Sequence, residues 1–545
     1  MRTQSLLALV TCMLISGTGA WPTTGIVHAA SPRVSASMGM TIEVNTFADE
    51  LNIDGNCSLR EAIQAANTDQ KFDECPAGQG ADTIELPAGT STLTLPGADE
   101  EGNATGDLDI HSDLALHGVW SGVTIIDGNQ LDRVLHVHGG AAVQVSGVTI
   151  RNGLTPSGLD DQNGGGDGGD GGGIWNEGNL ALLDCSVLAN HTGKGGDGFV
   201  SVGRGRGGRG GRGGGIANTG VLALTLSVVT SNVTGDGGVG GEGGDAPDDT
   251  GDGGGIFNTG QMIITASTVR DNRAGDGGGV FIWTGSWGGD GGDGGGIANH
   301  GQVTLVASTV SGNTAGPSGP ELTGRHVGGA GGDGGGIYNH GTTAWLTLVN
   351  STVSGNQAGH GGGSWGRFPG GRGGDGGGIY NDALLTASNA TVTSNLTGDG
   401  GSGELLAVSG AGGGIYNQNS AEVRNTILAG NTAGGTESDC EYPLTSKGYN
   451  FVQSITGCVL AGDLTGNIIG REPRLGPLAN YGGPTWTHAL LPLSPAVDAG
   501  SCIGLDGSPV TWDQRAASRP QGRGCDIGAY EGTFPPYLFL PLMRR

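Results

Sequence analysis

The residues of this chain that could bind a cation are aspartates set among glycines at regular intervals. Four segments read Gly-Gly-x-Gly-x-Asp and end at Asp170, Asp293, Asp333 and Asp375. The same six positions begin a calcium-binding nonapeptide repeat. If the segments stack, these acids and Asp252 form one column, and oxygen ligands so placed suit calcium, the one cofactor that the sequence suggests. The apolar eighth position is missing, so the alternative is that these acids only solvate the glycines around them.

Aromatic side chains are the second candidate group, because their faces can stack against sugar rings. Three tyrosines follow an isoleucine in successive repeats, so strand alternation points them away from the core. Three tryptophans lie in glycine-rich segments. The candidates are Tyr338, Tyr380, Tyr416, Trp283, Trp287 and Trp365. They predict glycan binding without catalysis, unless the glycine-rich segments fold over the rings as a small core.

The chain does not show the spacing that an enzyme active site requires, and we predict no catalytic residue. A glycoside hydrolase needs two or three carboxylates around one bond. The fragments Asn67-Thr68-Asp69, Asp160-Asp161 and Gly359-His360-Gly361 resemble hydrolase motifs but are separated by about 90 and then 200 residues. A lyase needs calcium-binding acids beside an Arg or Lys base, and the predicted strands are nearly free of charge. A polysaccharide lyase or glycoside hydrolase remains the alternative to a non-catalytic role.

A repeat of 36 to 42 residues positions all of these side chains. Its signature is Gly-Gly-Gly-Ile-x-Asn, followed by alternating apolar residues that indicate two or three short strands. The isoleucines are Ile174, Ile216, Ile256, Ile297, Ile337, Ile379 and Ile415. One unit cannot bury its apolar side alone, whereas stacked copies share a continuous core. The sequence therefore predicts an all-β fold, a right-handed parallel β-helix with rungs about 4.8 Å apart and a glycine-rich insert in each repeat.

The asparagine of the signature recurs once in every rung. These residues are Asn176, Asn218, Asn258, Asn299, Asn339, Asn381 and Asn417. Stacked at one corner, they can satisfy their amide donors and acceptors from rung to rung. We interpret this asparagine ladder as structural. A second asparagine follows the first strands of each repeat at a similarly regular distance.

The inserts repeat glycine with a period of three, as in residues 207–212 and 288–293. A left-handed polyglycine or polyproline II strand has three residues per turn. One hypothesis is that the inserts stack as a flat second layer held by backbone hydrogen bonds. The other is that they are flexible loops, because glycine loses the most entropy on ordering.

Six of the eight cysteines form three local pairs outside the repeats, where no stacking neighbour stabilises the fold. The pairs are Cys57 with Cys75, Cys440 with Cys458, and Cys502 with Cys525. Six cysteines allow 15 connectivities, so this pairing is a hypothesis. Cys185 occupies a column otherwise filled by small residues and is expected to be a buried thiol.

The first 30 residues have the features of a secretory signal peptide: a basic start, a short apolar run and small residues near possible cleavage sites. Export permits disulfides. No later apolar stretch is long enough for a transmembrane helix. The formal net charge of −27, without a basic cluster, argues against nucleic acid as a partner. The 118 glycines lack the strict period and the proline content of collagen.

Motifs on both flanks resemble known bacterial surface proteins. Residues 57–63, Cys-Ser-Leu-Arg-Glu-Ala-Ile, resemble the CSLREA motif, and Ser58 with Glu61 predicts a capping box for a helix over residues 59–66. This helix would cap the open end of the solenoid. Residues 494–500, 513–515, 519–520 and 525–531 are similar to the choice-of-anchor Q domain. The resemblance implies a pectin-lyase-like right-handed β-helix that is exported and surface-associated, usually without an assigned activity.

We expect five regions in the chain. They are the signal peptide at 1–30, an N-terminal cap with the first rungs at 41–165, the seven repeats at 166–436, a disulfide-stabilised C-terminal region at 437–531 and a tail at 532–545. The tail resembles a sorting signal, with a plain edge strand or a disordered end as the alternatives. Together these features predict an exported cell-surface structural or adhesion protein whose partner is a polysaccharide or another envelope component.

Overall fold

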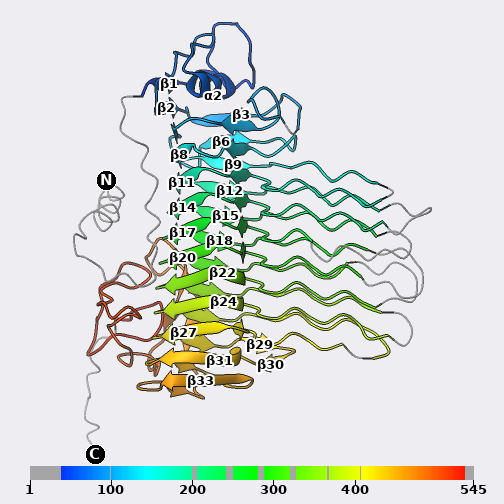
Figure 1. The fold of residues 1–545 in the computed structure, drawn as a ribbon. Helices are drawn as coiled ribbons and strands as arrows, with labels where there is room; N and C mark the ends of the chain where they lie inside the picture. The colour runs from blue at the N-terminus through cyan, green and yellow to red at the C-terminus, as the bar shows by residue number, and fades with distance from the viewer. Residues whose placement is uncertain are drawn as a thin grey trace, which may run out of the picture. The chain divides into compact units, whose positions relative to one another are not determined.

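A computed structural model shows a right-handed parallel β-helix, as predicted (Figure 1). The described residues are 39–98, 100–161, 163–198, 205–240, 250–279, 288–319, 327–364, 368–405 and 407–533, and all of them belong to one compact unit. The predicted signal peptide and nearly all of the predicted tail lie outside them. Among the described residues, no helix has the length and apolar character needed to cross a membrane.

Two long parallel sheets form the β-helix, and every repeat gives one strand to the smaller sheet. Five of the seven repeats give two strands to the larger sheet, and the fifth and sixth give it one long strand each. The larger, 20-stranded sheet contains β1 (Thr41–Glu43), β2 (Asp82–Glu85), β4 (Leu108–Ile110), β5 (Leu114–His117), β7 (Leu135–Val137), β8 (Ala142–Ser146), β10 (Ile174–Asn176), β11 (Asn179–Leu183), β13 (Ile216–Asn218), β14 (Val221–Thr225), β16 (Ile256–Asn258), β17 (Gln261–Thr265), β19 (Ile297–Asn299), β20 (Gln302–Val306), β22 (Ile337–Val349), β24 (Ile379–Ser388), β26 (Ile415–Asn417), β27 (Ser420–Arg424), β31 (Cys440–Lys447) and β33 (Cys458–Asp463).

The smaller sheet has 12 strands. They are β3 (Gly89–Thr92), β6 (Thr124–Asp127), β9 (Thr149–Arg151), β12 (Ser186–Leu188), β15 (Val228–Thr230), β18 (Thr268–Arg270), β21 (Thr309–Ser311), β23 (Thr352–Ser354), β25 (Thr391–Thr393), β28 (Ile427–Ala429), β32 (Phe451–Val452) and β34 (Ile468–Ile469). Two antiparallel pairs lie outside these sheets: β29 (Thr432–Ala433) with β30 (Thr436–Glu437), and β35 (Leu475–Ala479) with β36 (Thr487–Leu490).

The repeats stack in the register that the sequence predicts. Ile174 pairs with Ile216 and then Ile256, and Leu182 pairs with Leu224. These side chains are at most 1% exposed and form one continuous core along the coil. Because every rung buries its aliphatic side chains against the next, the core depends on the copies stacking in register.

Both asparagine positions form ladders along the coil. In the first, each Nδ2 from Asn176 to Asn381 donates to Oδ1 of the next rung's asparagine over 2.6–2.8 Å. In the second, which starts at Asn190, Nδ2 donates to the next Oδ1 over 2.9–3.0 Å. That ladder ends on Asp439, which accepts from Asn431. A carboxylate without N–H donors is a suitable end for such a ladder.

The three glycines of the signature meet two kinds of physical requirement. In the repeat that contains Ile216, Gly213 has φ of +66°, where a side chain would be strained. A Cβ on Gly214 would lie 2.4 Å from the Gly254 carbonyl oxygen, and one on Gly215 would lie 2.9 Å from Asn232 Nδ2. The signature thus combines one conformational and two packing requirements.

The described parts of the inserts form the hydrogen-bonded layer of the first hypothesis, which extends to one side of the β-helix (Figure 1). Each insert has an outgoing segment and a return segment, 191–198 and 205–213 in one repeat. Gly196 N donates to Gly166 O of the preceding return segment, and Gly208 N donates to Gly196 O, both over 2.8 Å. Segments of the same kind also bond, as in Gly195 N to Asp236 O at 2.9 Å. We call this structure the insert layer.

The N-terminal end of the coil is covered by α2 (Leu59–Thr68), whose capping box is present as predicted (Figure 1). Ser58 Oγ accepts from Glu61 N, and Glu61 Oε2 accepts from Ser58 N. Arg60 of the same motif is buried, pairs with Asp49 over 2.6 Å and donates to the carbonyl oxygens of Gly106 and Asp107. The motif therefore fastens the helix to the first rungs.

The three predicted disulfides are present. They join Cys57 to Cys75, Cys440 to Cys458, and Cys502 to Cys525.

Two of these bonds correct one expectation, that the pairs lie where no stacking neighbour stabilises the fold. Cys440 on β31 and Cys458 on β33 pair with neighbouring strands of the larger sheet and belong to its core. The bond between Cys57 and Cys75 is the other. Cys75 is fully buried and Cys57 is 2% exposed, and both side chains belong to the continuous core of the coil. Cys75 also exchanges two backbone hydrogen bonds with Phe72, over 2.9 and 3.2 Å. The core reaches this disulfide because α2, which lies between the two cysteines in the chain, packs its apolar face on the first rungs.

Cys185 is a buried free thiol, as predicted. Burial raises the pKa of the Cys185 thiol to about 12. Because the thiolate is the reactive form of cysteine, this residue is inert at neutral pH.

Residues 471–533 pack against the smaller sheet, where β21, β23 and β25 turn threonine and serine side chains outward. Gln514 is fully buried there and accepts from Thr352 Oγ1 over 2.6 Å while donating to Thr309 Oγ1 over 2.9 Å. Ser354 Oγ bonds His488 Nε2 over 2.8 Å. The polar Thr-Val-Ser and Thr-Val-Thr strands are therefore an internal docking surface of this chain.

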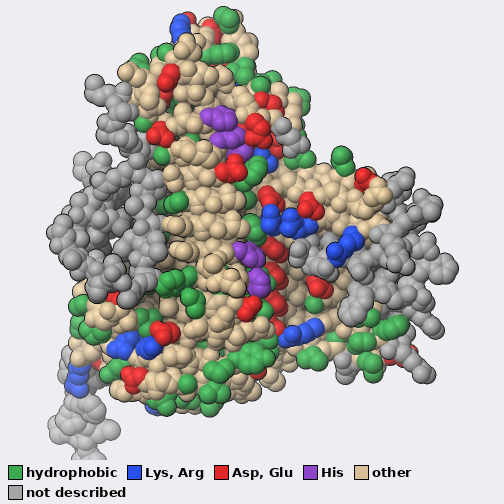
Figure 2. All heavy atoms as spheres, in the orientation of Figure 1, with side chains coloured by type: hydrophobic (Ala, Val, Ile, Leu, Met, Phe, Trp, Pro, Cys, Tyr) green, Lys and Arg blue, Asp and Glu red, His purple; other side chains and the backbone are tan. Residues whose placement is uncertain are grey.

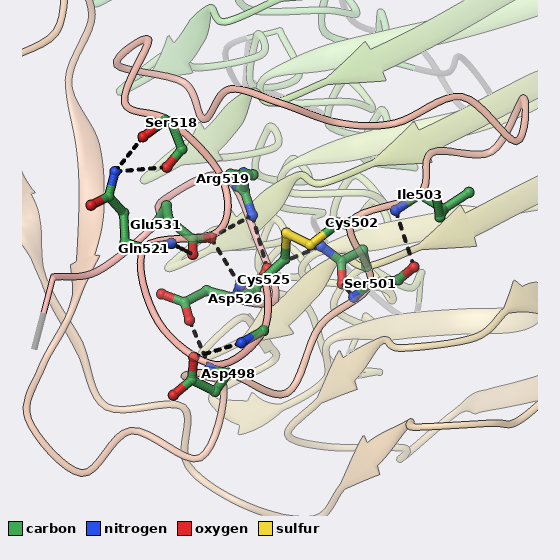
Figure 3. The surroundings of a disulfide bond; sticks show 12 residues. Asp498, Ser501, Cys502, Ile503, Ser518, Arg519, Gln521, Cys525, Asp526 and Glu531 are labelled. Carbon is green, nitrogen blue, oxygen red and sulfur yellow. Dashed lines mark hydrogen bonds and ion pairs between the residues drawn. A yellow bond between two sulfur atoms is a disulfide. The ribbon is translucent and has the colours of Figure 1, made fainter. Parts of the chain in front are cut away.

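Several residues of the choice-of-anchor resemblance meet around the Cys502–Cys525 disulfide (Figure 3). Arg519 and Glu531 form an ion pair over 3.2 Å with both side chains fully buried. Arg519 also donates to the carbonyl oxygens of Asp526 and Gly528. Burial raises the pKa of the Asp526 carboxyl to about 7 and lowers that of the Arg519 guanidinium. These contacts show a structural use for the motif, because they join its separate segments.

Candidate functional site

The candidate site lies where the larger sheet meets the insert layer. Strand pairing aligns one outward-facing position along this line: Asp109, His136, Trp175, Ala217, Phe257, Ala298, Tyr338, Tyr380 and Tyr416. We call the five aromatic residues Trp175, Phe257, Tyr338, Tyr380 and Tyr416 the aromatic column. Figure 2 shows charged side chains following the same junction.

The predicted aspartates form a second column beside it, on the return segments of the inserts. We call Asp252, Asp293, Asp333 and Asp375 the acidic column. Each Oδ1 accepts a backbone N–H from the next rung, over 2.8 Å from Asp293 to Asp252 and 2.6 Å from Asp333 to Asp293. Asp375 N and Ala411 N continue the series. These contacts give the third N–H of a Gly-Gly-x triplet its acceptor, which explains why acids recur at this position.

Asp170 lies in the same line, as the sequence predicts, and its Oδ1 accepts the backbone N–H of Arg212 over 2.7 Å, but Arg212 separates it from the four acids of this column. The next rung has Arg212 at the equivalent position, and its guanidinium pairs with Asp170 over 2.8 Å. Arg212 also lies over the Phe257 ring, 4.3 Å from its centroid. The Arg212 guanidinium is therefore a cationic partner for Asp170 at the N-terminal end of the line of acids.

Three members of the acidic column, Asp293, Asp333 and Asp375, have a pKa above that of an ordinary aspartate. Burial, followed by the neighbouring carboxylates, raises the pKa of Asp333 to about 7 and that of Asp293 well above its ordinary value. Burial also raises the pKa of Asp375, against the effect of Arg372. Stacked carboxylates without an intervening cation repel one another, and protonation relieves that repulsion.

A polar cavity of about 180 Å³ opens along the acidic column. Its lining includes Thr250, Asp252, Asp290, Asp293, Asp333 and Arg372. Carboxylate oxygens accept hydrogen bonds and the guanidinium donates them. The cavity can therefore bind a ligand rich in hydroxyl or amino groups, or a cation. Calcium binding by the column stays a prediction.

The tyrosines do not form an exposed track, which corrects the prediction that their faces stack against a ligand. Tyr380 and Tyr416 are only 8% and 4% exposed, and Tyr338 is half-buried. Their rings stack on one another with centroids 5.0 and 5.3 Å apart. Side chains of the insert layer reach the rings, since Asp293 bonds Tyr338 and Arg372 bonds Tyr416. The structure therefore favours the alternative, in which the inserts and the rings form a small core. Trp283, Trp287 and Trp365 lie outside the described residues.

The three hydrolase-like fragments lie on different rungs and make local contacts. Asp69 is the C-cap of α2, and Asn67 donates to the Asp109 carbonyl oxygen. Asp160 accepts from Asp197 N in the insert layer, and His360 contacts Gln357 and Asp399. The structure therefore does not bring the three fragments together at one site.

Sequence reasoning missed a group of four residues at the N-terminal end of the same line. Glu101, Asp109, His136 and His138, the histidine cluster, have ligand atoms within 4.8 Å of one another. The His-x-His spacing on a predicted strand was the available signal, since alternation turns both imidazoles to one face. Their acidic partners lie 27 or more residues earlier, outside the repeats.

No protein-family profile matches the sequence, and no curated protein matches it. The structure is similar to the crystal structure of pectate lyase Pel9A, with 13% sequence identity and a TM-score of 0.37. The similarity covers 91% of this chain and 98% of that chain. The β-helix assignment rests on the strand pairing itself, and the CSLREA and choice-of-anchor resemblance stays a prediction.

Proposed function

We propose that this chain is an exported cell-surface structural or adhesion protein that binds a polysaccharide without catalysis. The observation that carries the proposal is the polar cavity on the acidic column, which is set in a rigid ladder of repeated rungs. Repeated carboxylates along a groove can bind successive hydroxyl groups of a polymer. The three disulfides support export, because such bonds persist in oxidising compartments.

The charge of the site indicates which glycans fit. Four aspartates face Arg372 in the cavity lining, and the whole chain carries a formal charge of −27. Like charges repel, so neutral or amino sugars suit the cavity better than polyuronates. The same charge argues against the alternative function, a lyase or hydrolase acting on an anionic polysaccharide. On this proposal the flanking motifs belong to a CSLREA and choice-of-anchor surface protein.

A glycan array with the mature chain tests the proposal, using neutral, amino and uronic polysaccharides. The double variant Asp293→Asn/Asp333→Asn keeps the Oδ1 acceptors and removes two ionisable carboxyl groups from the cavity. We expect it to lose binding to the preferred glycan by about tenfold, the effect of one charge-assisted hydrogen bond. Asp236→Asn is the matched control, since Asp236 accepts Asp276 N in the same manner on an outgoing segment.

Assays for unsaturated uronates and for new reducing ends are run on the same polysaccharides. Turnover of any polymer would overturn the non-catalytic proposal and establish the enzyme alternative. Equal binding by the wild type and the double variant would remove the acidic column from the site.

A further inference from the structure

The histidine cluster is built from two neighbouring rungs and one connection. Asp109 on β4 and His136 on β7 are paired in register. His138 follows His136 on the same outward face, while Val137 between them is fully buried in the core. Glu101 comes from the segment that precedes β4, and its carbonyl oxygen bonds His111 Nε2 over 2.8 Å.

The cluster contains a buried nitrogen whose capacity for hydrogen bonding is unused in the described part of the chain. The His136 side chain is 2% exposed, and its Nδ1 has no hydrogen-bond partner among the described residues. This atom lies 3.4 Å from Glu101 Oε2 and 3.4 Å from Asp109 Oδ1. Buried polar atoms normally have a partner. An electron-pair donor aimed at two carboxylate oxygens indicates a position for a cation between them.

The other ring nitrogen of His136 already has the contact that metal-binding histidines make. Its Nε2 lies 3.2 Å from Glu177 Oε2. A carboxylate in this place holds the proton on Nε2 and leaves the lone pair of Nδ1 toward the cluster. The ring is also held between Trp175, 4.4 Å away and nearly parallel, and His138, 3.7 Å away.

The separations of the ligand atoms fit a tetrahedron. Two atoms bound at the usual Zn–N and Zn–O distances of about 2.1 Å lie about 3.4 Å apart at the tetrahedral angle. His136 Nδ1 lies at that distance from both oxygens. His138 Nε2 lies 3.7 Å from Glu101 Oε2 and 2.8 Å from Asp109 Oδ1, so of these four separations only the last must widen. Asn103 N holds the other Asp109 oxygen over 2.9 Å.

We propose that Glu101, Asp109, His136 and His138 bind one divalent transition-metal ion, with Zn²⁺ as the ion of first choice. Two imidazole nitrogens and two carboxylate oxygens are ligands that Zn²⁺ accepts, whereas calcium prefers a shell of six to eight oxygens. Four protein ligands close the tetrahedron, so the role is structural. The metal ties the segment before β4 to two strands beneath α2, and the exposed Glu101 provides the entry path.

The test uses the mature chain after EDTA treatment and dialysis against ZnCl₂. We expect one zinc per chain by elemental analysis, a higher unfolding temperature with zinc, and with Co²⁺ the intense visible absorption of a tetrahedral site. Glu101→Gln and His138→Ala should each weaken zinc binding at least 100-fold. Glu177→Gln, which changes only the outer carboxylate, should weaken it 10- to 100-fold.

The matched control is His340→Ala, which removes an outward-facing imidazole of the same sheet whose Nδ1 lies 3.1 Å from Asp382. This variant should bind zinc as the wild type does. Glu101 is exposed, so Glu101→Gln tests the site even if a histidine variant fails to fold. Absence of stoichiometric zinc in the wild type, or undiminished binding by Glu101→Gln and His138→Ala, would overturn the proposal.

Discussion

Adding one methyl group inside the insert layer tests whether close backbone contact, and not flexibility, is the reason for the glycines. Gly208 bonds Gly196 on one side and accepts from Gly238 on the other, both over 2.8 Å. A Cβ on Gly208 would lie 1.8 Å from the Gly166 carbonyl oxygen, where ordinary contact begins at 3.4 Å. The backbone of Gly208 does not have the positive φ that favours glycine, so the effect of Gly208→Ala comes from packing alone.

The expected cost follows from these distances. To relieve this contact, the segment of Gly208 must move about 1.6 Å away from Gly166. We expect that movement to break the hydrogen bonds of Gly208 with Gly196 and Gly238. Each bond contributes roughly 1 kcal/mol net, and overpacking costs roughly 1–3 kcal/mol. We therefore expect Gly208→Ala to destabilise the layer locally by about 3–5 kcal/mol.

Hydrogen exchange followed by mass spectrometry measures this effect. Peptides covering residues 191–213 should exchange at least 100-fold faster in Gly208→Ala than in the wild type, because about 3 kcal/mol corresponds to more than a hundredfold in the opening equilibrium. Gly139→Ala is the control, since a Cβ there has nothing within 4 Å. Equal exchange in the two variants, or complete exchange of the wild-type insert amides within seconds, would refute an ordered insert layer.

Three further predictions concern the ladders and the buried charges. Asn272→Ala removes a side-chain amide that accepts from Asn232 N and donates to Val229 O. It should lower the free energy of unfolding, measured by urea titration, by about 2–4 kcal/mol. A decrease below about 0.5 kcal/mol would contradict a stabilising role of the ladder. The raised pKa of Asp333 means that the folded state binds its proton more tightly than the unfolded state does. The stability this contributes is fully present below about pH 4 and is lost as the pH rises through about 7, so the unfolding temperature should fall between about pH 4 and pH 7. Asp333→Asn should reduce this fall by roughly 2–4 °C. An unchanged pH profile in the variant would show that Asp333 does not bind a proton in this range. Calcium at pH 8 should raise the unfolding temperature of the wild type more than that of this variant. Glu531→Gln removes the ion-pair partner of the buried Arg519 and should lower the free energy of unfolding by about 3–5 kcal/mol. Proteolysis of residues 471–533 should then be faster than in the wild type, and an unchanged rate would contradict this prediction.

The coil itself could be predicted because its requirements are the same in every rung. A stacked Ile174 or Asn176 meets the equivalent residue of the next copy, so the same side chain is needed again after each turn. The capping box of α2 and the three disulfide pairs were also predictable, since they depend on partners close in the chain. The burial of Cys75 in the core was not, because it depends on how α2 packs on the first rungs.

The sites depend on contacts that no repeat encodes. The sequence alone determined that the tyrosines point outward and that the aspartates align, because strand alternation and the period decide both. Only the tertiary structure decided that Tyr380 and Tyr416 are buried, that Arg212 separates Asp170 from the other acids, and that Asp109 meets His136. The physical reason is twofold. Glycine has no side chain, so a glycine-rich insert gives no apolar pattern that would predict what it packs against. A contact that occurs once between two rungs does not recur in the sequence, so no repeat indicates it.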